Sequence, residues 1–149
     1  MCSSDLAEVQ TADGGTIPRD MNVVIKATDA SHFNVSWTST TYRADGTTKD
    51  KSYSINFSQR GKSDVYEAAM KRDLFGNDIQ LDPMKGEPYV WGRIIDDTLT
   101  VYSLTVDTEG GYDLQQFDRK LAEGGLELTF QNIHNGTIAR SVTTFLKKQ

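Results

Sequence analysis

The sequence has little cysteine, histidine and proline, and each shortage excludes a class of protein. Its 149 residues include one cysteine, two histidines and three prolines. One cysteine cannot form a disulfide within the chain, and together with two histidines it cannot build a Cys/His zinc site. No apolar run approaches the roughly 18 residues of a membrane span. We therefore expect no disulfide framework, no metal site and no transmembrane segment.

Basic charge is also scarce. Sixteen Lys and Arg stand against 21 Asp and Glu, which gives a net charge of −5, and the pI is near 4.9. A nucleic-acid binder needs a basic face, so this balance argues against nucleic acid as a partner. The length indicates one domain, and such a chain buries roughly 70% of its extended surface on folding. It therefore needs no metal to fold, and nothing in it calls for a cofactor.

From Met21 onward, apolar residues recur with period two, the pattern of strands with one buried and one solvated face. The alternation is clearest in three groups: Phe33, Val35 and Trp37; Tyr53, Ile55 and Phe57; and Leu126, Leu128 and Phe130. Thr, Val, Tyr and Phe, which strands prefer, are abundant in these runs.

Turn residues separate the alternating runs at regular intervals. Asn135-Gly136 is the strongest signal, because the tight hairpin turn it favours needs positive φ at both positions. The other turns fall at Ala44-Asp45-Gly46, Asp96-Asp97, Glu109-Gly110-Gly111 and Glu123-Gly124-Gly125. The spacing predicts about eight antiparallel strands in up-and-down order over residues 21–149. A meander of this length closes on itself to hide its edges, so we predict an all-β barrel.

Residues 63–88 interrupt this rhythm and hold two of the three prolines. The spacing of Tyr66, Ala69 and Met70 predicts either a short helix capped by Ser63 or a short strand ending near Met70. The rest of the segment is a long loop. Loops of this length in small domains are often functional, so Phe75 and Met84 are either lid residues over a barrel mouth or apolar plugs of its open end.

The first 20 residues are polar and small, and we expect them to form a flexible tail. They contain no apolar signal region. Cys2 followed by two serines is typical of a processed bacterial lipoprotein, whose first residue is an acylated cysteine; Met1 would then not be native. This interpretation predicts a periplasmic protein that contacts the membrane only through Cys2. The alternative is a cytoplasmic protein with a frayed terminus.

The stretch from Pro88 to Lys148 carries a resemblance to the lipocalin-like, or calycin, barrels. Tyr89–Ile94 leads into Asp97–Tyr102, and Gly110–Leu114 leads into Leu121–Leu128. The chain looks like the small bacterial lipocalin-like proteins of unassigned function. The likeness is one of architecture, since the first strand has no Gly-x-Trp and Arg140 does not begin an Arg-x-Tyr. It implies a barrel that encloses a small ligand.

Alternate residues of a strand point to opposite faces of the sheet, so odd or even position along a strand (its parity) selects candidate ligand-binding residues. Arg140 shares a strand face with Val142 and Leu146, so its guanidinium is either an anion anchor in the barrel, a partner of Asp118, or a group that reaches the rim. Trp91 and Arg93 share one face of the strand Tyr89–Ile95, but both faces are apolar enough to be the inner one.

We expect non-covalent binding of a small ligand inside the barrel, either apolar or amphipathic, with an anionic group as one option. Trp37, Trp91, Tyr112 and Phe130 would be its walls, and Arg93 or Arg140 would orient a negative head group. A second hypothesis is an envelope interaction or assembly module with a protein partner, whose barrel is a scaffold filled by its own side chains. An enzyme ranks last, because no acid, base or nucleophile stands at a recognisable spacing and no catalytic residue is assigned.

Overall fold

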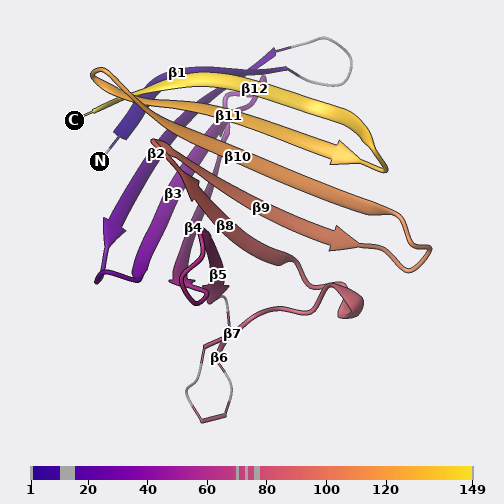
Figure 1. Cartoon of the computed structure of the whole chain (residues 1–149). Coiled ribbons are helices and arrows are strands. Elements are labelled where there is room, and N and C mark those ends of the chain that lie inside the picture. The colour runs from indigo at the N-terminus through magenta and orange to yellow at the C-terminus, as the bar shows by residue number, and fades with distance from the viewer. Residues whose placement is uncertain (1, 11–15, 70, 73, 76–77, 149) are drawn as a thin grey trace.

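The computed structural model describes residues 2–10, 16–69, 71–72, 74–75 and 78–148; side chains are described for residues 20–68, 74–75 and 79–148. Figure 1 shows a single barrel with one projecting segment. The strands are β1 (Cys2–Gln10), β2 (Thr16–Ala27), β3 (His32–Tyr42), β4 (Thr48–Gln59), β5 (Val65–Ala69), β6 (Lys71–Arg72), β7 (Asp78–Ile79), β8 (Tyr89–Ile95), β9 (Thr98–Val106), β10 (Tyr112–Ala122), β11 (Gly125–His134) and β12 (Thr137–Lys148). One turn of 3-10 helix, η1, spans Pro83–Lys85.

The barrel closes in the order β1-β12-β11-β10-β9-β8-β5-β4-β3-β2, and β6 pairs with β7 outside it. All of the described pairings are antiparallel. The predicted all-β, up-and-down barrel is thus confirmed. The predicted Asn-Gly turn is confirmed too, with φ of 48° at Asn135 and 84° at Gly136.

Two strands of the barrel go beyond the expected eight. β1 pairs with β2 and β12 within the stretch where the sequence predicts a flexible tail. Strand pairing uses backbone groups, so a polar segment can close a sheet without an apolar pattern that would reveal it. The second is β5, which bridges β4 and β8. It confirms the short-strand interpretation of this stretch, and the helical one is wrong; Ser63 Oγ donates to Arg60 O in the β4–β5 turn instead of capping a helix.

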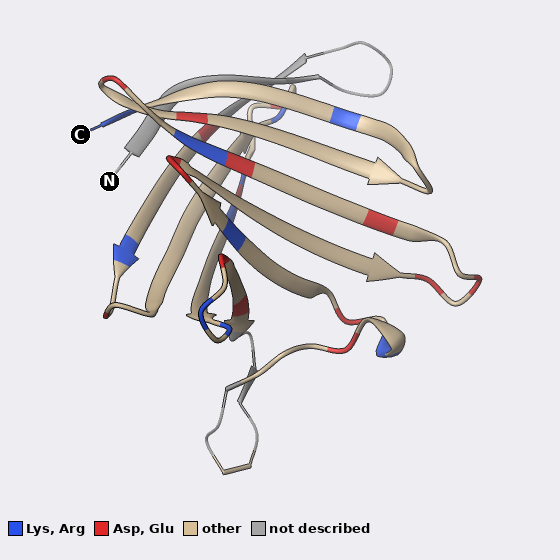
Figure 2. Ribbon diagram, viewed as in Figure 1, with Lys and Arg blue, Asp and Glu red and all other residues tan. Residues whose placement is uncertain are grey.

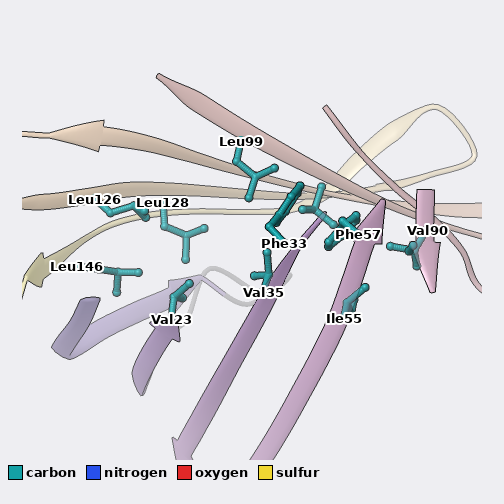
Figure 3. Close-up of a cluster of buried hydrophobic side chains, with 12 residues drawn as sticks. Val23, Phe33, Val35, Ile55, Phe57, Val90, Leu99, Leu126, Leu128 and Leu146 are labelled. Atoms are coloured by element: carbon teal, nitrogen blue, oxygen red, sulfur yellow. The ribbon is translucent and has the colours of Figure 1, made fainter. Parts of the chain in front are cut away.

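Buried side chains fill one end of the barrel, which we call the packed end; it carries the turns at residues 28–31, 96–97 and 123–124. Phe33 stacks on Phe57 with ring centroids 5.0 Å apart. Figure 3 shows aliphatic side chains from several strands meeting these rings. The cluster consists of Val23, Phe33, Val35, Ile55, Phe57, Ala68, Val90, Leu99, Val101, Leu126, Leu128 and Leu146.

The opposite, open end carries the turns at residues 43–47, 107–111 and 135–136. Here the wall is incomplete between β4 and β8, because β5 pairs with β4 only from Asn56 to Gln59. In the described pairings, the first half of β4 is bonded to β3 alone. The barrel is therefore hollow and accessible at this end. Acidic residues lie largely at turns (Figure 2).

Candidate functional site

A cavity of about 450 Å³ occupies the open half of the barrel. This volume lies within the usual range for small-molecule pockets, roughly 300–1,000 Å³. Twelve of its 20 described lining residues are apolar or aromatic, and the other eight are polar or charged. The lining comprises Met21, Val23, Trp37, Ser39, Thr41, Lys49, Lys51, Tyr53, Ile55, Pro88, Val90, Val101, Ser103, Gln115, Phe117, Arg119, Leu128, Phe130, Arg140 and Val142.

Arg119 lies at the base of this cavity. It projects from the inner face of β10, where it pairs across with Leu99 on β9 and Leu128 on β11. Both leucines belong to the buried cluster, so the arginine stands where the packed end meets the cavity. The residue is 2% exposed, and it is the one charged residue among the described buried residues.

The Arg119 guanidinium lies against two aromatic rings, and two of its three nitrogens have no hydrogen-bond partner. Its central carbon lies 5.5 Å from the Trp37 ring centroid and 5.3 Å from that of Phe117. Nε and Nη1 are buried and have no hydrogen-bond partner. Burial lowers the pKa of Arg119 to about 10, and the charge of Asp118 partly offsets this effect. The group is therefore a cation at neutral pH with two unused donors.

A buried cation with unused donors is costly in an empty cavity and useful in a filled one. Burying a charge without hydrogen bonds costs several kcal/mol. A planar guanidinium offers parallel N–H donors that match a carboxylate or phosphate. The arrangement can therefore bind an anionic group at the base of an apolar cavity.

Three of the predicted ligand-binding residues line the cavity: Trp37, Phe130 and Arg140. Trp37 also stacks on Tyr53, with centroids 5.0 Å apart. Arg140 is exposed and lies at the open end of the barrel. This position agrees with the interpretation that its guanidinium reaches the rim. It does not pair with Asp118, whose carboxylate accepts hydrogen bonds from Thr100 and Gln116 on the outer face.

Trp91, Arg93 and Tyr112 do not line the cavity, and their placement there is corrected. Gly92 and Val90 take the inner positions of β8, so Trp91 and Arg93 point outward. Gly92 is decisive because the Phe57 ring packs against it: a Cβ there would lie 3.2 Å from that ring. On the outer face Trp91 stacks on Tyr102 at 4.9 Å. Tyr112 stands on the face of β10 opposite to that of Arg119, so it belongs to the outer face of the barrel.

Phe75 and Met84 are 89% and 84% exposed and are not among the described cavity-lining residues. They do not plug the open end, and their role as lid residues stays a prediction. The lipid-attachment prediction concerns the side chain of Cys2, which lies outside the described side chains. Among the described residues, no helix is long and apolar enough to cross a bilayer.

Arg119 is the residue that sequence reasoning missed, although a signal for it was present. The tight turn at Glu123-Gly124 fixes the register between β10 and β11, which places Arg119 opposite Leu128. Leu128 belongs to the predicted apolar face of its strand. Since cross-strand partners point to the same face of a sheet, Arg119 is expected to point into the barrel as well.

Comparisons with known proteins add no assignment. No family model matches the chain, and neither a curated protein nor a solved structure matches it.

Proposed function

We propose that the protein binds a small amphipathic anion non-covalently, with the anionic group on Arg119 and the apolar part in the cavity. The single observation that carries this proposal is the buried Arg119, which lines the 450 Å³ cavity and whose Nε and Nη1 have no hydrogen-bond partner. Native proteins rarely leave buried donors unpaired, and a bound ligand is one explanation for the exceptions.

The charges around the cavity support an anion over a neutral ligand. Four cationic residues, Lys49, Lys51, Arg119 and Arg140, line it, and no Asp or Glu is among the described lining residues. This is a local reversal of sign in a chain whose net charge is −5.

We also propose, from the architecture alone, that the chain is a relative of the lipocalin-like barrels. The up-and-down antiparallel order and the hollow open end support this assignment. The alternatives of an assembly module and of an enzyme stay hypotheses. A cavity of this size favours ligand binding over a barrel that is only a scaffold.

Tryptophan fluorescence tests the proposal, because one tryptophan lines the cavity and the other does not. In Trp91→Phe, Trp37 is the sole reporter, and titration with dodecanoate should change its emission saturably. In the matched Trp37→Phe variant, Trp91 reports from the outer face and should change little.

Arg119→Met should weaken dodecanoate binding about 10- to 100-fold, since hydrogen bonds to a charged group contribute about 1.5–3 kcal/mol. Arg93→Met removes the same charge from the outer face and should leave the affinity near that of the wild type. An unresponsive Trp37, or equal affinities in the two arginine variants, would contradict the proposal.

A further inference from the structure

The cationic residues that line the cavity lie either at its base or toward the open end of the barrel. Arg119 is buried there, whereas Lys49, Lys51 and Arg140 are exposed at the open end. The strand registers give the separation between the two levels along two independent routes.

The first route runs along β11. Arg119 is opposite Leu128, and Arg140 is opposite Asn132. Leu128 and Asn132 are four residues apart on one strand, so at about 3.3 Å per residue the two arginine backbones lie about 13 Å apart along it.

The second route runs along β3, on a different part of the barrel wall. The Trp37 ring is at the level of the Arg119 guanidinium. Lys51 is opposite Ser39 and Lys49 is opposite Thr41, which places the two lysines about 7 and 13 Å further toward the open end. The two routes thus place Arg140 and Lys49 about 13 Å from the buried arginine, with Lys51 about halfway along the β3 route.

On β2, β11 and β12 an apolar belt lies between Arg119 and the level of Lys49 and Arg140, and Lys51 on β4 stands at the level of this belt. Phe130 lies midway between Leu128 and Asn132 on β11, and Val142 is its cross-strand partner. Met21 takes the corresponding place on β2, opposite Ser39, and all three residues line the cavity. One small head group on Arg119 cannot also reach Lys49 or Arg140 across this belt.

We infer that the ligand carries two anionic groups joined by an apolar spacer, one group on Arg119 and the other on the rim of Lys49, Lys51 and Arg140. This inference rests on the proposed function and specifies its ligand class: a linear dianion such as an α,ω-dicarboxylate. No carboxylate among the described lining residues competes for the rim cations. Since the rim is exposed, its contribution should be screened by salt, whereas that of the buried arginine should persist.

Isothermal titration calorimetry with dodecanoate and dodecanedioate tests the inference, because the two probes differ only in the second carboxylate. At low salt the wild type should bind the diacid at least about tenfold more tightly, which is the effect of about 1.4 kcal/mol. Raising the salt concentration should reduce this difference.

A triple rim variant, Lys49→Met, Lys51→Met and Arg140→Met, should bind both probes with the affinity that the wild type has for dodecanoate. The matched control changes Lys26, Lys120 and Arg93 to Met; all three are exposed residues outside the described cavity lining. This control loses the same charge and should keep the preference for the diacid. Near-UV circular dichroism of both variants verifies that the fold is intact.

The outcomes separate the two proposals. If dodecanoate binding depends on Arg119 but dodecanedioate binds no more tightly, the dianion inference fails and the proposed function stands. A diacid preference that survives in the triple rim variant would overturn the rim assignment. If neither probe binds, both proposals fail.

Discussion

Replacing Arg119 with methionine should stabilise the ligand-free protein. Folding lowers the pKa of this group well below its ordinary value, to about 10, and each pKa unit corresponds to 1.36 kcal/mol. The buried charge therefore costs roughly 3 kcal/mol of folding free energy at neutral pH. The penalty is fully present below the folded-state pKa of about 10. It disappears as the pH rises from there toward the ordinary pKa of arginine, because the unfolded chain keeps this proton to higher pH.

Methionine keeps the apolar stem but loses the contacts of the guanidinium with Trp37 and Phe117. Cation–π contacts contribute about 0.5–2 kcal/mol, and we take about 1–2 kcal/mol for the two together. The free energy of unfolding should then rise by about 1–2 kcal/mol, and the Tm by about 2–4 °C for each kcal/mol.

Urea unfolding followed by circular dichroism measures this change. Arg119→Lys keeps a buried charge and should not be stabilised, whereas Arg93→Met, on the exposed outer face, should stay within about 0.5 kcal/mol of the wild type. A folded Arg119→Met variant that is less stable than the wild type by about 1 kcal/mol or more would refute the reasoning, since the guanidinium would then be a structural group.

Three further predictions concern the packed end and the surface. Gly92→Ala places a Cβ 3.2 Å from the Phe57 ring and should lower the free energy of unfolding by about 1–3 kcal/mol in urea titrations; an unchanged midpoint would contradict this packing. Asp29 accepts hydrogen bonds from Ser31, which, together with its His32 contact, lower its pKa to about 2. Its stabilising effect should be present above pH 4 and lost as the pH falls toward 2; an ordinary pKa in a carboxyl NMR titration would count against these bonds. The hydrogen bond of Tyr42 to Asp20 raises the tyrosine pKa, so Tyr42→Phe should remove the latest-titrating component from an ultraviolet pH titration.

Much of the fold could be predicted because alternating strands and tight turns leave local signals. Phe33 and Phe57 lie on the apolar faces predicted for their strands, and they are cross-strand partners. β1 could not be predicted in this way, since its polar residues give no alternation and its pairing depends on closure of the whole sheet.

The site was less predictable because parity alone does not say which face is inner. Both faces of β8 are apolar. Which of them is the inner face depends on the contact between Gly92 and the ring of Phe57, which lies on another strand. Trp91 and Arg93 were therefore misplaced. Arg140 was found because its strand has one clear apolar face, and Arg119 could have been found from the register across Glu123-Gly124.

The most direct test of an anion-binding cavity is a crystal structure of the protein with dodecanoate bound. We expect the carboxylate within hydrogen-bonding distance of the Arg119 guanidinium, and the alkyl chain along Trp37 and Phe130 toward the open end. A chain that enters tail first, with its carboxylate at the rim and Arg119 still without a partner, would contradict the central claim.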